Sequence, residues 1–165
     1  MAAHETGDPG HAPGMDDFYL EMVNGTLRES HDPHKRIACV LSSRDGRTVA
    51  AANRMPDGVA SDVPGRDVHP GKADWLQHAE TRAVALAARL GVPLEGATSY
   101  LNWFPCHRCA PVLIDAGIRE VVGTLPDFQH HRYGTSFRIA ASMSEEAGVR
   151  TRVFSCIGGR LPAAA

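Results

Sequence analysis

The sequence has few cysteines, little net charge and no long hydrophobic run, and each shortage excludes a class of protein. Four cysteines in 165 residues are a poor basis for a disulfide-stabilised scaffold. A formal net charge of −2 provides no general attraction to nucleic acid. No apolar run approaches the roughly 18 residues of a membrane span, and the N-terminal segment has no apolar core of the secretory kind. We therefore expect a cytoplasmic protein that binds neither a membrane nor, at this charge, nucleic acid.

Length and apolar content together indicate one globular domain. With 165 residues, 43% of them hydrophobic, the chain can bury a core of its own without disulfides. Residues 1–14 are rich in Gly, Pro, Ala and His and lack periodicity, so we expect a flexible N-terminal tail. The sequence predicts a single domain over residues 15–157 and a frayed C-terminal tail over 158–165.

Hydrophobic periodicity predicts helices that alternate with strands. A first helix over 16–30 is expected to turn Phe18, Met22, Val23 and Leu27 toward the core, and Asp45-Gly46 is expected to close a hairpin. An alanine-rich helix over 75–90 would end at Gly91. Strands are expected over 36–41, 48–52, 98–102, 120–123 and 149–155, and further helices over 106–116 and 136–147. This alternation is typical of an α/β fold with helices on both faces of a sheet.

Two short motifs carry the side chains of a metal site. His78-Ala79-Glu80 lies in the alanine-rich helix, and Pro105-Cys106-His107-Arg108-Cys109 opens another. The two cysteines are three residues apart, so on a helix they share a face and can reach one ion. Catalytic zinc sites use three protein ligands and keep a position for water, whereas structural sites are closed by four. His78, Cys106 and Cys109 therefore predict one catalytic Zn²⁺ per chain.

Glu80 lies two residues from the histidine and is predicted to move protons rather than to bind the metal. Two thiolates neutralise Zn²⁺, so the metal alone should acidify its water weakly, and a nearby carboxylate is useful. Glu80 could take the proton of the water, deliver it to a ring nitrogen and later protonate the departing amine. The order H-x-E and then P-C-x-x-C is typical of zinc deaminases, which hydrolyse an aromatic C–NH₂ to C=O and release ammonia.

Three other interpretations of these residues remain open. A structural zinc site would take a fourth ligand, such as His107, His130 or His131. A redox pair would use the two cysteines and leave His78-Ala79-Glu80 without a role. A non-catalytic, zinc-stabilised binding module is the third, and the intact Glu80 and the open ligand position argue against it.

Around these motifs the chain resembles the cytidine/deoxycytidylate deaminase superfamily, over roughly residues 35–155. The segments DWLQHAE, YLNWFPCHRCAPVLIDAGIREVV and PDFQHHRYG are most similar to a bacterial branch of nucleobase deaminases. The resemblance implies a five-stranded mixed sheet in a three-layer α/β/α sandwich, with His78, Cys106 and Cys109 on zinc and Glu80 as the proton shuttle. It also implies a homodimer.

The resemblance further suggests which residues surround the substrate. Asn53 follows the second strand in an N-x-x-P-x-G turn, where its amide could offer a donor and an acceptor to a base edge. The alternative is an asparagine that stabilises its own turn. Aromatic and apolar side chains near the two motifs could sandwich a flat ring. The expected substrate contacts are Asn53, Asp74, Ala79, Trp103, Phe104, Pro105 and Tyr133.

The identity of the substrate is the feature that the sequence determines least. Relatives often continue HAE with Arg-Asn-Ala, whereas this chain has Thr81-Arg82-Ala83, and Arg82 could contact an acidic group of the ligand or point to solvent. Beyond Arg54, Arg66 and Lys72 we find no cationic cluster for a phosphate, and the mild acidity argues against a tRNA substrate. We therefore expect a small amino-heterocycle, either a free or modified nucleobase or a triazine-like ring. A deoxycytidylate or cytidine substrate is the alternative.

Overall fold

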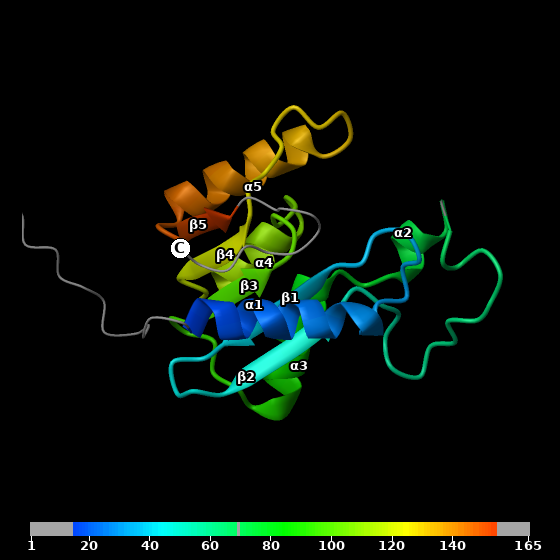
Figure 1. Ribbon diagram of the computed structural model, residues 1–165, viewed down its shortest axis with the longest axis horizontal. Helices are drawn as coiled ribbons and strands as arrows, with labels where there is room; N and C mark the ends of the chain where they lie inside the picture. The colour runs from blue at the N-terminus through cyan, green and yellow to red at the C-terminus, as the bar shows by residue number, and fades with distance from the viewer. Residues whose placement is uncertain (1–14, 69, 155–165) are drawn as a thin grey trace, which may run out of the picture.

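A five-stranded mixed sheet forms the centre of the computed structural model, which describes residues 15–68 and 70–154 (Figure 1). Its strands are β1 (Ala38–Ser42), β2 (Thr48–Ala52), β3 (Thr98–Leu101), β4 (Glu120–Thr124) and β5 (Arg150–Phe154). Their order across the sheet is β2-β1-β3-β4-β5. The tails expected over 1–14 and 158–165 lie outside the described residues, as do the last three residues of the expected domain, 155–157.

The sheet is antiparallel at one edge and parallel at the other. β1 pairs antiparallel with β2 and β3, whereas β3, β4 and β5 run parallel. The hairpin from β1 to β2 turns at the predicted Asp45-Gly46, where Gly46 has a φ of +86° that glycine adopts without strain. The parallel strands are joined through helices, because parallel neighbours need a crossover connection. All five strands lie close to their predicted ranges.

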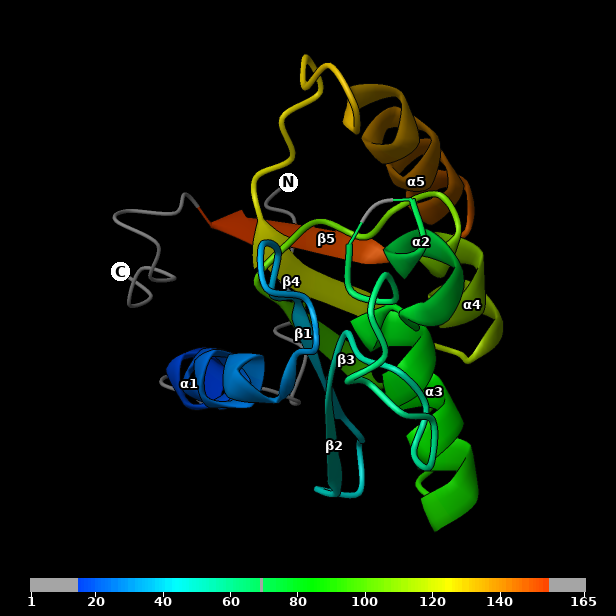
Figure 2. The ribbon, with the colours of Figure 1, turned by 90° about the vertical axis from the view of Figure 1, so that its right-hand side faces the viewer.

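Helices cover both faces of the sheet. Figure 2 shows α1 (Met15–Thr26), which a short 3-10 turn η1 (Leu27–Glu29) extends, on one face, and α3 (Ala79–Leu90), α4 (Cys109–Asp115) and α5 (Gly134–Glu146) on the other. The core beneath α1 contains Val23, Val40 and Tyr100, and the core beneath α3 contains Ala83, Leu41 and Leu101. The predicted three-layer α/β/α sandwich is therefore confirmed. In the described part of the chain, no helix has the length and apolar character needed to cross a membrane.

One side chain that we expected in the core lies on the surface. Phe18 is 56% exposed, whereas Tyr19, Leu20 and Val23 are buried. Tyr19 stacks on Tyr100 of β3, with ring centroids 4.8 Å apart. This contact fixes the rotation of α1 about its axis and turns Phe18 outward, so the prediction for Phe18 was wrong.

The helix expected over 75–90 is divided in two. A short α2 (Lys72–Trp75) ends before an extended segment, and α3 begins at Ala79. The extended segment is held by two backbone hydrogen bonds between Arg54 and Gln77, which form an isolated antiparallel bridge. His78 therefore precedes α3 instead of lying in its first turn, because tertiary pairing overrides the helical propensity of the sequence.

The second motif also enters its helix later than predicted. α4 begins at Cys109, and the N–H groups of Cys109 and Ala110 both donate to the carbonyl of Cys106 at 3.0 Å. Cys106 therefore lies in a turn that leads into the helix. Both motifs consequently bring their metal-ligating side chains to the N-terminal ends of helices on the same face of the sheet.

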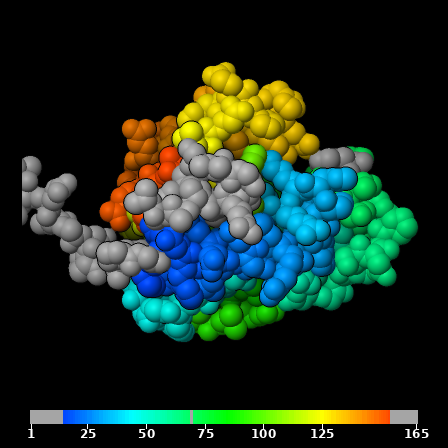
Figure 3. All heavy atoms as spheres, in the orientation of Figure 1, coloured from blue at the N-terminus to red at the C-terminus, as the bar shows by residue number. Residues whose placement is uncertain are grey.

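The long loop between β2 and α2, residues 53–71, lies against the segment that follows α1. In Figure 3 the two form one continuous surface at one end of the molecule, where the lighter blue meets the green. An ion pair ties the end of the loop to this segment, since Nζ of Lys72, the first residue of α2, lies 2.8 Å from Asp32 Oδ2. This end of the molecule contains the candidate site.

Candidate functional site

The His, Cys, Cys group predicted from the sequence comes together at the N-terminal ends of α3 and α4. His78 Nδ1 lies 3.6 Å from Cys106 Sγ and 3.3 Å from Cys109 Sγ, and the two sulfurs are 3.6 Å apart. A tetrahedral Zn²⁺ with usual bond lengths separates two sulfur ligands by about 3.8 Å and a sulfur from a nitrogen by about 3.6 Å. The donor set and its spacing therefore fit one zinc ion.

No fourth ligand belongs to this group within residues 15–68 and 70–154. His107, which follows the first cysteine, instead has its Nδ1 2.9 Å from Ser136 Oγ on α5. Its backbone N–H donates to the same hydroxyl at 3.0 Å. A group of three protein ligands is the arrangement typical of catalytic zinc.

The hydrogen bonds among His78, Cys106 and Cys109 shift the pKa values of the two thiols in opposite directions. Hydrogen bonding between the two cysteine sulfurs, together with the adjacent His78, lowers the pKa of the Cys106 thiol to about 3. The same contact with Cys106 raises the pKa of Cys109, and burial adds to the rise. The sulfur of Cys106 also raises the pKa of His78. The group thus favours a thiolate at Cys106, and binding of a cation would displace the remaining protons.

Glu80 lies in the first turn of α3, beside the metal-ligating group. It is only 4% exposed, and its burial raises the pKa of the carboxyl above its usual range. A carboxyl group that is poised closer to neutral pH exchanges protons more readily in both directions. The position and environment of Glu80 therefore suit a group that accepts a proton and later returns it.

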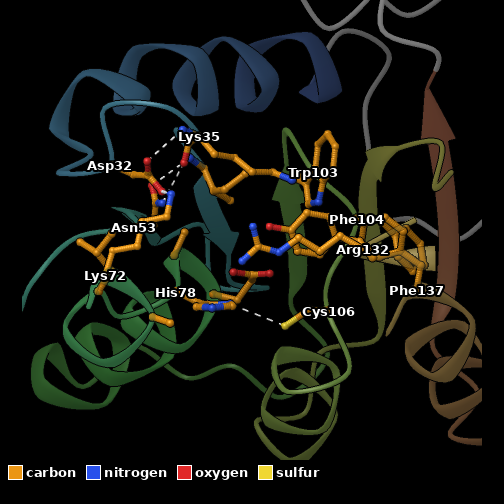
Figure 4. A pocket seen from close by; sticks show the side chains of 16 residues that line it. Asp32, Lys35, Asn53, Lys72, His78, Trp103, Phe104, Cys106, Arg132 and Phe137 are labelled. Atoms are coloured by element: carbon orange, nitrogen blue, oxygen red, sulfur yellow. Dashed lines mark hydrogen bonds and ion pairs between the residues drawn. The ribbon is translucent and has the colours of Figure 1, made fainter. Parts of the chain in front are cut away.

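A cavity of about 200 Å³ opens onto Glu80 and the metal-ligating group. It is smaller than the roughly 300–1,000 Å³ of most ligand pockets, which suits a small substrate. Figure 4 shows side chains that converge on it from the long loop, from the segment after α1 and from the start of α5. Its lining consists of Asp32, Lys35, Ile37, Asn53, Lys72, Ala73, Leu76, His78, Ala79, Glu80, Trp103, Phe104, Cys106, Arg132, Tyr133 and Phe137.

Five of the seven expected substrate contacts line this cavity, and two do not. Asn53, Ala79, Trp103, Phe104 and Tyr133 belong to the lining. Asp74 is exposed on α2, outside the lining, because α2 ends before the extended segment that leads to His78. Pro105 is buried in the turn before Cys106 and does not reach the cavity wall either.

Asn53 is held by its own side-chain hydrogen bonds. Its Oδ1 accepts from the hydroxyl of Ser30 at 2.6 Å and from the N–H of Ile37 at 2.9 Å. Its Nδ2 donates to the carbonyl of Lys35 at 2.9 Å. Asn53 therefore fastens the segment before β1 to the end of β2, and it lines the cavity with an amide whose position is fixed.

Four charged residues of the lining were not predicted as site residues. Asp32 and Lys72 form the ion pair described above, and Lys35 and Arg132 add two further cations. In Figure 4, Lys35 reaches across toward Trp103, and Arg132 enters from the opposite wall. No local sequence pattern predicts this cluster, because its members come from three segments that are far apart in the sequence. It is the cationic group that the sequence alone did not reveal.

Arg82 takes neither of the positions that we considered for it. It is 9% exposed, does not line the cavity, and donates from Nη2 to Asp57 Oδ1 at 2.8 Å. The partner lies in the long loop, so the arginine neither contacts a ligand nor points to solvent. A loop residue distant in sequence satisfies its charge instead.

Comparison with known proteins agrees with this geometry. The family model described as the cytidine and deoxycytidylate deaminase zinc-binding region matches residues 14–125. The human deoxycytidylate deaminase is 28% identical over 144 residues, covering 84% of this chain and 78% of that protein. An uncharacterized deaminase of Aliivibrio fischeri is 31% identical over 133 residues, covering 79% of this chain and 87% of that protein.

Solved structures resemble the fold as well. The dCMP deaminase of cyanophage S-TIM5, crystallised in complex with dCMP and dUMP, superposes with a TM-score of 0.69 at 16% identity. The match covers 87% of this chain and 99% of that chain. At this identity the likeness shows the fold, a five-stranded sheet of the cytidine deaminase type.

Proposed function

Since this chain belongs to the cytidine and deoxycytidylate deaminase family, we propose that it hydrolyses the ring amino group of a cytosine nucleotide and releases ammonia. The family makes the protein a deaminase, a hydrolase acting on a C–N bond, and a zinc protein with one Zn²⁺ per chain. The nucleotide substrate and the role of each residue are the proposal. The cations around the cavity are the observation that carries it.

The proposed division of labour follows from the positions of the side chains. His78, Cys106 and Cys109 would hold the zinc, which when bound would polarise a water molecule, and Glu80 would supply the base that two thiolate ligands make necessary. The carboxylate of Glu80 accepts the proton of that water and delivers it to the ring nitrogen next to the amino group. Glu80 then takes the remaining proton of the added hydroxyl and passes it to the amine, so that the C–N bond breaks, ammonia leaves and C=O forms. Its burial keeps bulk water from competing for the proton.

The charge of the cavity lining supports a substrate with an anionic group. Lys35, Lys72 and Arg132 outnumber Asp32, the acidic residue at the same end of the cavity. Deoxycytidylate deaminases are the relatives at 28% identity that cover most of this chain. A phosphate bound by lysine and arginine would gain charge-assisted hydrogen bonds, which are stronger than neutral ones.

A free amino-heterocycle is the second candidate, and it was our expectation from the sequence. The small volume of the cavity favours it, because a single ring needs less room than a nucleotide. The expected homodimer and cytoplasmic location also remain predictions. Size-exclusion chromatography with light scattering would test the dimer.

Ammonia release from a panel of substrates tests the proposal. The zinc-loaded protein is incubated with cytosine, deoxycytidine, dCMP, aminopurines and aminotriazines at equal concentration. We expect the highest kcat/KM for the cytosine monophosphate. Preferential turnover of a free base would replace the nucleotide proposal with the second candidate. Turnover of none of them would contradict both.

A substitution of Glu80 tests the assigned proton carrier. Glu80→Gln preserves the shape of the side chain and removes its proton affinity, so we expect kcat to fall by about 10²- to 10⁴-fold. Zinc content, measured by elemental analysis, should stay at one per chain. Normal turnover with normal zinc content would remove Glu80 from the mechanism.

A further inference from the structure

We infer that Lys35 is the side chain that selects the anionic group of the substrate, and that Trp103 and Tyr133 hold its ammonium in place for this purpose. The inference rests on the proposed nucleotide function and deepens it. Three cations line the cavity, and they differ in what already neutralises them. Lys72 forms an ion pair with Asp32, whereas Lys35 is available for an anion of the ligand.

Lys72 is already neutralised by a carboxylate. Its Nζ lies 2.8 Å from Asp32 Oδ2, and the two side chains are only 13% and 6% exposed. The other oxygen of Asp32 accepts the N–H groups of His34 and Lys35 at 2.9 and 3.0 Å. This pair joins the long loop to the segment before β1, and its charges cancel. Lys72 is therefore a structural cation with little attraction left for a ligand.

Lys35 makes no ion pair with any residue of the described segments. Asp32 influences it only from beyond ion-pair distance, and Arg132 and Lys72 act on it as like charges. Its side chain is half-buried in the cavity wall. The ammonium is thus desolvated and repelled without a counterion, so an anion that entered the cavity would gain a strong partner.

Two aromatic rings define where this ammonium lies. Lys35 Nζ is 3.5 Å from the centroid of the Trp103 ring and 3.9 Å from that of Tyr133. The rings meet edge to face, at an interplanar angle of 80° and 6.4 Å between centroids. Both also pack against Phe137, which is buried. Cation–π attraction to two supported rings replaces part of the lost hydration and restricts a flexible side chain to one place.

Trp103 and Tyr133, which we expected to contact the substrate, instead contact the ammonium of Lys35. A ring that carries an ammonium on its face is not free to stack on a substrate base through that same face. Trp103 and Tyr133 are therefore positioning residues for Lys35, which itself is the specificity-determining group. Phe104 and Ala79 remain at the cavity wall for the ring of the substrate.

Equilibrium binding of product analogues tests Lys35 separately from catalysis. Dissociation constants of dUMP and deoxyuridine are measured by calorimetry on the zinc-loaded protein and on four variants, Lys35→Met, Lys35→Arg, Trp103→Leu and Lys72→Met. The phosphate is the only difference between the two ligands, so the ratio of their constants isolates its contribution. An unchanged deoxyuridine constant shows that a variant retains its folded cavity.

For Lys35→Met we expect the preference for dUMP over deoxyuridine to fall by about 10- to 100-fold, the range of a hydrogen bond between charged groups. Lys35→Arg should retain the preference within about threefold, since it preserves the charge. Trp103→Leu should reduce the preference by a smaller factor, because the ammonium would lose its fixed position.

The matched control is Lys72→Met, which should leave the preference intact even if it lowers stability. A preference that survives in Lys35→Met and disappears in Lys72→Met would overturn the inference and assign the role to Lys72. A wild-type protein that binds both ligands equally would contradict the proposed nucleotide function itself. The two failures are thus distinguishable from the same measurements.

Discussion

Arg82 Nη2 donates to Asp57 Oδ1 at 2.8 Å, and this contact joins the helix that carries Glu80 to the middle of the long loop. The arginine is nearly buried, whereas the side chain of Asp57 is 50% exposed. The hydrogen bond from Arg82 lowers the pKa of the Asp57 carboxyl below its usual range. Since α3 contributes Ala79 and Glu80 to the cavity wall, the pair ties the helix behind this wall to the loop.

Removal of this contact should lower stability measurably. In Arg82→Met an apolar side chain replaces the buried stem of the arginine while the hydrogen bond is lost. We therefore expect the melting temperature to fall by about 2–4 °C. The matched control is Arg89→Met, because Arg89 lies 3.5 Å from the same carboxylate but is 64% exposed. Calorimetry should show almost no change for the control. Equal shifts in both variants would argue against a special role for Arg82.

Zinc content should depend on the two cysteines of the motif and not on the third described thiol. Cys109→Ser replaces a thiolate by a poorer zinc ligand, and we expect the bound zinc after dialysis to fall well below one per chain together with deaminase activity. Cys39→Ala removes a buried thiol of β1 that lies 3.5 Å from the hydroxyl of Ser99. It should retain its zinc while losing some stability. Atomic absorption on both variants decides the point, and a normal zinc content in Cys109→Ser would exclude it as a ligand.

A methyl group at Gly134 should disturb the segment that carries Arg132 and Tyr133. A Cβ at this position would lie 2.4 Å from the carbonyl oxygen of Phe128, so the backbone would have to move. We expect Gly134→Ala to cost about 1–3 kcal/mol of unfolding free energy, the usual effect of overpacking, and to weaken dUMP binding. Denaturant unfolding and calorimetry would measure the two effects.

Gly25→Ala provides the control for that substitution. A Cβ at Gly25 meets no heavy atom within 4 Å, and the residue lies inside α1. Alanine is there expected to stabilise the protein by about 0.5–1 kcal/mol, because it is the better helix former. Similar destabilisation by both alanines would mean that the close approach at Gly134 is not the cause.

The affinity for an anionic ligand should decline as the pH rises through about 8. Burial lowers the pKa of Lys35 to about 8, with Arg132 and Lys72 adding repulsion and Asp32 opposing it. The protonated form attracts the phosphate, so the attraction is complete below this pH and is lost above it, by up to about tenfold per pH unit. The ratio of the dissociation constants of dUMP and deoxyuridine removes the effect of any titrating group that acts equally on both ligands. Lys35→Arg should make the ratio independent of pH between 7 and 9, and a pH-independent wild type would contradict the prediction.

The gathering of His78, Cys106 and Cys109 was predictable because the spacing within each motif is local. The two cysteines are three residues apart, and His78 and Glu80 are separated by one residue, so short-range geometry already restricts their chemistry. The sheet was predictable for a similar reason, since each strand is a short apolar run between turn residues. The start of α3 was less predictable. It is set by the bridge between Arg54 and Gln77, which is a tertiary contact that the local sequence does not encode.

The cationic lining could not be predicted from the sequence. Lys35 and Arg132 are almost a hundred residues apart, and each stands among other charged or polar residues that point elsewhere. Only the fold decides which of them turn inward. The same holds for Arg82, whose burial depends on Asp57 in the loop. Residues that act through long-range charge pairing leave no periodic signal in a single sequence.

The attachment points of the long loop also determine which part of it could change in length. Its first residues are held by the bridge from Arg54 to Gln77, and its last by the pair of Lys72 with Asp32. Arg66, near the end of the loop, also lies 3.8 Å from the centroid of the Trp75 ring. Residues 61–64 before it are exposed, so lengthening this stretch costs mainly closure entropy, about 0.6 kcal/mol for each doubling. That stretch is therefore where a tag, a fluorophore or an added recognition segment can be inserted while His78, Cys106 and Cys109 keep their geometry.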